Sequence, residues 1–121
     1  MAGIVFFATE SLPAVLEWYR DVLDFETWLE QPDCTILRRG NLLLGFCERD
    51  RADTDGIVTV LVDSRAAVEE FHERLGDRAE GPPSENERYR IFHCFGTDPD
   101  GRAVEIQTFL HEIEPIPGVD E

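Results

Sequence analysis

The sequence contains no lysine, and its 11 arginines are outnumbered by 26 acidic residues, which gives a formal net charge of −15. An acidic excess of this size repels phosphate backbones and anionic lipids, so the composition argues against binding to nucleic acid or to membranes. The acidic residues are spread along the whole chain, which indicates a solvated surface rather than one cation site. Acidity without lysine resembles cytosolic proteins of salt-loving microorganisms, and we expect a halophilic protein.

Cysteine is also scarce: Cys34, Cys47 and Cys94 are odd in number and far apart, and no CxxC pair occurs. A disulfide scaffold is therefore not expected, and a reducing compartment is more natural. No basic region followed by a long apolar one opens the sequence, so no signal peptide is expected, and no apolar run is long enough to span a membrane. These absences predict a cytoplasmic protein.

What the sequence does contain is an internal repeat. Gly3-Ile4-Val5 recurs as Gly56-Ile57-Val58, and in each copy an acidic residue followed by Ser11 or Ser64 precedes an apolar helical stretch that carries an aromatic residue. A period of this size indicates two copies of one supersecondary unit. Paired units leave a cleft between them, so the residues that line the cleft are expected to decide the function.

Hydrophobic periodicity predicts the order strand, helix and three strands in each copy. The predicted strands are residues 4–9, 25–30, 35–39, 42–47, 57–62, 89–95 and 103–109, with helices after Ser11 and over 66–75 and a loop or short strand within 78–87. We expect a single domain over residues 1–121. It comprises module one at about 3–48, a linker at about 49–55, module two at about 56–110 and a loose acidic tail at 112–121.

Several segments resemble the vicinal oxygen chelate superfamily, which includes glyoxalase I, extradiol dioxygenases and the fosfomycin- and bleomycin-resistance proteins. They are residues 18–25 (WYRDVLDF), Val62-Asp63, and 98–101 (DPDG) followed by Val104-Glu105-Ile106. Residues 36–44 (ILRRGNLLL) are similar to a segment of the bleomycin-resistance group, which looks nearest. The resemblance implies an α+β fold of paired βαβββ modules that form a curved, partly closed mixed sheet around a cleft, with the helices outside. It also implies a homodimer.

Metal-using members of the superfamily place one His or Glu ligand on each of four strands. Carried over singly, these positions fall on Ile4 (or Phe6, if the register lies two residues further), Gly45, Ile57 and Glu105. Only Glu105 can bind a metal, and one ligand cannot hold a catalytic ion. We therefore predict neither a metal nor another cofactor.

Strand alternation predicts which side chains line the cleft. They are mostly apolar or aromatic with a few polar groups, which is typical of a small-molecule site, although the same residues could simply fill a core. A buried carboxylate without a metal needs a hydrogen-bond donor, so a ligand with an amine, amide or hydroxyl is expected. The predicted ligand-binding residues are Phe6, Trp28, Gly45, Cys47, Ile57, Thr59, Glu105, Gln107 and Phe109.

Three functions remain open. The leading hypothesis is a metal-free protein without catalytic residues that binds a small organic ligand in a dimeric cleft. The second is a metal-dependent lyase, dioxygenase or thiol transferase with a site rebuilt from Glu105, His93 and Glu48. The third is a structural or regulatory dimer without a ligand. His93 itself is interpreted as a packed or hydrogen-bonded core residue, and Cys47 as a buried filler rather than a nucleophile.

Overall fold

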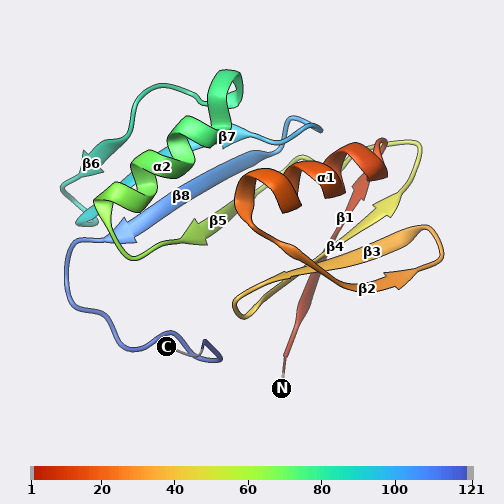
Figure 1. Cartoon of the computed structure of the whole chain (residues 1–121), viewed down its shortest axis with the longest axis horizontal. Coiled ribbons are helices and arrows are strands. Elements are labelled where there is room, and N and C mark those ends of the chain that lie inside the picture. Colours follow the sequence, from red (N-terminus) through yellow and green to blue (C-terminus); the bar gives the residue numbers. More distant parts are fainter. Residues whose placement is uncertain (1, 120–121) are drawn as a thin grey trace. The chain divides into compact units, whose positions relative to one another are not determined.

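A computed structural model describes residues 2–119 of the chain. The chain divides into two compact units, and we describe each by itself. Unit 1 comprises Met1–Thr54 together with Pro115–Glu121, and unit 2 comprises Asp55–Glu114 (Figure 1). None of the helices in the described part is both long and apolar enough to cross a membrane.

Within residues 2–119 each unit contains one α-helix and one four-stranded mixed sheet, so the predicted α+β fold of paired βαβββ modules is confirmed. In both sheets the first strand of the unit runs parallel to the last, and the other pairs are antiparallel. Unit 1 is built from β1 (Ile4–Thr9), α1 (Leu12–Leu23), β2 (Glu26–Gln31), β3 (Cys34–Arg39) and β4 (Leu42–Glu48), in the sheet order β1-β4-β3-β2. Unit 2 is built from β5 (Ile57–Leu61), α2 (Arg65–Leu75), the 3₁₀ turn η1 (Gly76–Arg78), β6 (Ser84–Asn86), β7 (Ile91–Thr97) and β8 (Ala103–Phe109), in the order β5-β8-β7-β6.

In each unit the helix covers one face of the sheet. The Tyr19 ring of α1 is fully buried and lies 5.0 Å from the Phe46 ring of β4, centroid to centroid. In unit 2, α2 contacts β7 and β8 and buries Val68, Phe71 and Leu75. Because side chains alternate along a strand, the neighbours of Phe46 on β4 belong to the other face of that sheet.

The two helices begin differently. Ser11 and Ser64 are the N-cap residues of α1 and α2, and Ser64 accepts a hydrogen bond from the Ala67 backbone N–H at 3.1 Å. The Ser11 side chain makes no such capping bond. The Glu48 carboxylate instead accepts a hydrogen bond from the Leu12 N–H at 3.1 Å. Its negative charge is stabilised there by the dipole at the N-terminus of the helix. Glu48 therefore supplies the capping hydrogen bond of α1.

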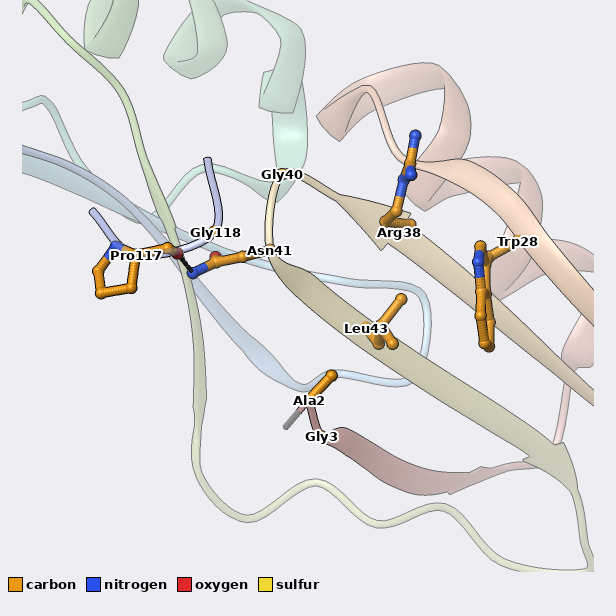
Figure 2. Close-up of a pocket in the computed structure, with 9 residues that line it drawn as sticks. All are labelled: Ala2, Gly3, Trp28, Arg38, Gly40, Asn41, Leu43, Pro117 and Gly118. Atoms are coloured by element: carbon orange, nitrogen blue, oxygen red, sulfur yellow. Dashed lines mark hydrogen bonds between the residues drawn. The ribbon is translucent and has the colours of Figure 1, made fainter. Parts of the chain in front are cut away.

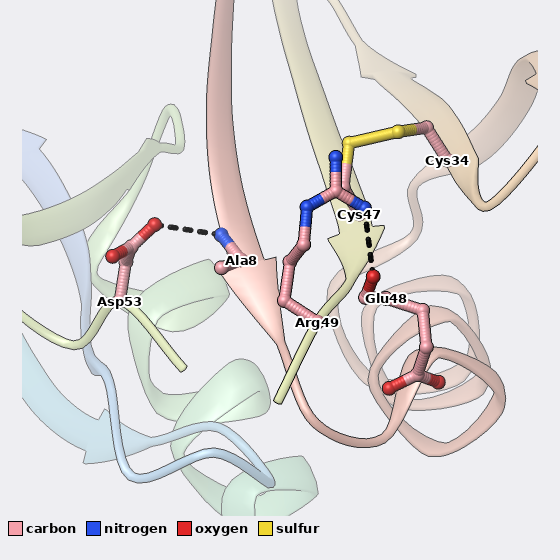
Figure 3. Close-up of a disulfide and its surroundings, with 6 residues drawn as sticks. All are labelled: Ala8, Cys34, Cys47, Glu48, Arg49 and Asp53. Atoms are coloured by element: carbon pink, nitrogen blue, oxygen red, sulfur yellow. Dashed lines mark hydrogen bonds between the residues drawn. A yellow bond between two sulfur atoms is a disulfide. The ribbon is translucent and has the colours of Figure 1, made fainter. Parts of the chain in front are cut away.

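The expectation of unpaired cysteines is also wrong, because Cys34 and Cys47 form a disulfide (Figure 3). The two residues face each other across the β3–β4 hairpin, with Cα atoms 4.0 Å apart. The register follows from the tight turn at Gly40-Asn41, which brings Arg39 opposite Leu42 and so aligns the rest of the ladder. Cys94 is free and buried. Cysteine content thus no longer argues for a reducing compartment.

The predicted loose tail covers residues 112–121. Residues 120 and 121 lie outside the described residues, and the part up to residue 119 makes hydrogen bonds. The Asn41 side-chain amide donates a hydrogen bond to the Pro117 carbonyl oxygen, and the Val119 N–H donates to the Ile116 carbonyl at 3.4 Å. Residues 115–119 therefore belong to unit 1, although the residues just before them belong to unit 2. Asn41, predicted only as a turn residue, holds this segment to the β3–β4 turn.

Candidate ligand-binding site

Glu105 lies in the middle of β8, on the sheet face opposite α2. Its neighbours Val104 and Ile106 are fully buried, and alternation places the Glu105 side chain on the other face. That side chain is nevertheless only 10% exposed. A carboxylate withdrawn this far from water must be hydrogen-bonded to be tolerated.

Three side chains from three strands supply those hydrogen bonds. Thr59 of β5 donates its hydroxyl to Oε1 of Glu105 at 2.8 Å, and Gln107 of β8 donates its amide to Oε2 at 3.0 Å. His93 of β7 bonds the same Oε2 through Nδ1 at 2.6 Å. The strand register produces this cluster, since Thr59 is paired with Glu105 and His93 with Gln107.

The surroundings of Glu105 keep it ionised. Burial by itself would raise its pKa, but the hydrogen bonds from His93, Thr59 and Gln107 and the charge interaction with His93 together lower the pKa below its ordinary value of 4.5. An ionised carboxylate only accepts hydrogen bonds, so Nδ1 of His93 is the donor. Nε2 of His93 is then left for a ligand: it accepts a hydrogen bond when the imidazole is neutral and donates one when the imidazole is protonated.

The cluster therefore presents two polar groups to a ligand. One is Nε2 of His93, and the other is the side-chain carbonyl of Gln107, an acceptor on the amide whose nitrogen donates to Glu105. Apolar groups lie beside them: the Phe95 ring is 5.0 Å from the His93 ring, and alternation puts Phe109 on the same face of β8 as Glu105. Ile57, on the same face of β5, is 57% exposed.

Five of the nine predicted ligand-binding residues thus lie on one face of the unit 2 sheet, and three of them share one hydrogen-bond network. The other four lie in unit 1, and none of the contacts of Glu105 described above involves them. There, Phe6 is paired with Gly45, Cys47 is held in the disulfide, and Trp28 is half exposed on β2.

His93 is absent from the predicted ligand-binding residues and appears in the sequence analysis only as a hydrogen-bonded core residue and in the alternative metal site. It makes the shortest of the three bonds to Glu105. The sequence feature that could have placed His93 beside Glu105 is the turn at Asp98–Gly101, because this turn fixes the register of the β7–β8 hairpin. From that turn, His93 falls opposite Gln107 and diagonal to Glu105. Diagonal neighbours on one sheet face are within reach of long side chains.

The strand pairing also corrects the positions compared with metal ligands. Phe6 pairs with Gly45 in one sheet, and Thr59 pairs with Glu105 in the equivalent strands of the other. The repeat therefore makes Thr59, rather than Ile57, the counterpart of Phe6. Phenylalanine and glycine supply no ligand, and within residues 2–119 no group of three His, Cys, Asp or Glu side chains could hold a metal. The residues present do not fit the metal centre that the fold suggests.

No protein-family model matches the sequence, and no curated protein sequence matches it significantly. Solved structures do match. A glyoxalase-related enzyme from Fulvimarina pelagi has a TM-score of 0.79 at 15% identity, over 99% of this chain and 95% of that one. A glyoxalase/bleomycin resistance protein/dioxygenase family enzyme from Burkholderia phytofirmans PsJN has a TM-score of 0.78 at 18% identity, over 88% and 97%.

This is the glyoxalase/bleomycin-resistance fold. The fold implied by the resemblance to the vicinal oxygen chelate superfamily is confirmed. A lactoylglutathione lyase from Agrobacterium tumefaciens has the same glyoxalase-type fold, with a TM-score of 0.71 at 21% identity over 87% of this chain and 90% of that one. Such low identities establish the glyoxalase-type architecture and leave the chemistry to the residues of the site.

Proposed function

We propose that this protein binds a small organic ligand on the face of the unit 2 sheet opposite α2, beside Glu105, without using a metal. The observation that supports this is the buried, ionised carboxylate held by His93, Thr59 and Gln107 from three strands. Buried charges stabilise a fold poorly compared with apolar residues of the same size, and they concentrate at functional sites.

Nε2 of His93 and the Gln107 carbonyl define the ligand. A compound with N–H or O–H groups can donate to the Gln107 carbonyl and, when His93 is neutral, to its Nε2, while a flat apolar part lies against Phe95 or Phe109. This refines the sequence prediction, because Glu105 already has three donors from the protein. Its role is to fix the tautomer of His93 and the orientation of the Gln107 amide.

The test is calorimetric titration of compounds found by a thermal-shift screen, since a ligand selective for the native state raises the melting temperature. Replacing His93 with Phe removes the hydrogen bond of Nε2 and should weaken binding by about 1–3 kcal/mol. Glu69→Gln, on the exposed side of α2, is the control and should bind like the parent. Equal affinity in the His93 variant and the control would refute the proposed site.

We propose further that the protein is a homodimer. The support is the apolar character of two edge strands: Val5 and Phe6 on β1 are each 50% exposed, and Ile57 on β5 is 57% exposed. Exposed edge strands invite pairing and are normally covered. Sedimentation at micromolar concentration in high salt should give twice the chain mass of 13.8 kDa, and a monomer under those conditions would exclude the dimer.

A metal-dependent reaction is the second candidate, because one structural neighbour is described as a lactoylglutathione lyase. In this chain Glu105 and His93 would have to supply the ligands. Metal analysis of protein purified without an affinity tag separates the two candidates. We expect well below one equivalent of zinc, nickel, iron or manganese, whereas a stoichiometric ion that is lost in Glu105→Gln would establish the metal site.

A dimer without a ligand, the third candidate, predicts that no compound in the screen shifts the melting temperature.

A further inference from the structure

Unit 1 contains a pocket of about 620 Å³, within the size range of small-molecule sites (Figure 2). Strands β2, β3 and β4 form one part of it, and the two ends of the chain form another. We propose that this pocket is a second binding site, for a flat aromatic carboxylate. Its lining residues are Ala2, Gly3, Trp28, Arg38, Gly40, Asn41, Leu43, Pro117 and Gly118.

Trp28 provides the surface for the aromatic ring. It is 50% exposed, although tryptophan is usually well buried, and it sits where the β2–β3 register shifts between Thr27 and Leu29. Bulges of this kind re-aim a side chain. Leu43, paired with Arg38 across the β3–β4 hairpin, adds apolar surface to the same pocket. An indole face next to an aliphatic side chain suits stacking of a planar ring.

Arg38 determines the charge of the ligand. Among the described residues of the lining it is the one charged side chain, in a chain with 26 acidic and 11 basic residues. It pairs with the Glu26 carboxylate at 3.7 Å, and the two side chains are 52% and 76% exposed. A pair so long and so exposed holds the guanidinium weakly. The guanidinium is therefore available to a carboxylate, which it can bind through two parallel N–H bonds.

Pro117 and Gly118, near the end of the chain, also line the pocket. Asn41 donates to the Pro117 carbonyl, and a Cβ placed on Gly118 would lie 3.3 Å from Cβ of Asn41. This contact brings Pro117 and Gly118 to the turn that ends β3, beside Arg38. The pocket is thus lined both by Trp28, at the β2 bulge, and by residues 117–118, which the Asn41 hydrogen bond holds in place.

The experiment is an NMR titration of the full chain, labelled with ¹⁵N at the tryptophan indoles, with 2-naphthoate. The chain has two tryptophans, and Trp18→Phe assigns the Trp28 signal. We expect saturable shifts of the Trp28 signal and affinity about tenfold lower for neutral 2-naphthamide, which keeps the ring and loses the charge. Because the signal reports on unit 1, its outcome is independent of the proposed site at Glu105.

Arg38→Gln should lower the affinity for 2-naphthoate about tenfold and leave that for 2-naphthamide unchanged. Arg51→Gln is the matched control, because Arg51 is also an exposed arginine of unit 1 paired with one acidic residue, Asp53. An unchanged indole spectrum in both variants shows that they fold. Three results would overturn the proposal: no shift of the Trp28 signal, equal affinity of the carboxylate and the amide, or equal affinity of the Arg38 and Arg51 variants.

Discussion

The Phe6 ring lies directly over Gly45, its partner in the parallel pairing of β1 and β4. A Cβ atom on Gly45 would fall 2.4 Å from two carbons of that ring, a distance at which one of them must move. The glycine is thus required by a close approach rather than by its backbone angles. These are two of the positions that the resemblance compares with metal ligands, and here they form an apolar contact.

Gly45→Ala should destabilise the protein by about 1–2 kcal/mol, because the added methyl group displaces the Phe6 ring from its contact with the strand. The same change in a Phe6→Ala background should have almost no effect, since the obstructing ring is gone. Urea unfolding of the parent, the two single variants and the double variant measures the coupling. An equal loss of stability in both backgrounds would mean that Gly45 is needed for another reason.

The disulfide makes a simpler prediction. Unreduced protein in denaturant should titrate with one thiol, that of Cys94, and reduced protein with all three of its cysteines. Replacing Cys34 and Cys47 together with serine should lower the free energy of unfolding by about 2–3 kcal/mol, because the bond closes a short loop in the unfolded chain. Three reactive thiols without any reductant would show that the pair is not oxidised in the isolated protein.

The local apolar pattern of the sequence is sufficient to predict the order of helices and strands. The exact strand ends and the contacts between strands depend on turns and on cross-strand register. The strand predicted at residues 89–95 is found at Ile91–Thr97. Tyr89 donates its N–H to the Asn86 side chain, and Arg90 has φ of +56°, so both residues belong to a turn. Polar side chains that bond the backbone locally compete with strand formation, and apolar alternation does not reveal this.

The hydrogen-bonded cluster around Glu105 could likewise be predicted only in part. Glu105, Gln107 and Thr59 follow from alternation along single strands, which needs no pairing. His93 and the disulfide required two strands to be aligned, and the turns at Gly40-Asn41 and Asp98–Gly101 held that information. The pocket at Trp28 could not be predicted, because it depends on a bulge and on a contact between the Asn41 turn and Pro117.

Stability should rise with salt at low concentrations, because the net charge of −15 makes the folded chain repel itself. Counterions screen that repulsion, and the Debye length shrinks from about 10 Å at 0.1 M to about 3 Å at 1 M, so most of the gain should come early. The melting temperature in sodium chloride is the measurement. A melting temperature independent of salt would show that the acidic surface contributes little self-repulsion.

The hydrogen bonds to Glu105 should make stability depend on pH in acid. Burial opposes ionisation of this carboxyl, but the bonds from His93, Thr59 and Gln107 prevail and lower its pKa below 4.5 in the folded protein. A group with a lowered folded pKa stabilises the fold above its unfolded pKa, and that contribution is lost as the pH falls through the folded value.

The stability difference between the parent and Glu105→Gln should therefore be constant above about pH 5 and shrink below about pH 4.5. Glu69→Gln, on the exposed face of α2, should show no such trend. Urea unfolding of the three proteins between pH 7 and pH 3 measures it, and a difference that grows in acid would mean that Glu105 is held protonated by burial rather than ionised by its three donors.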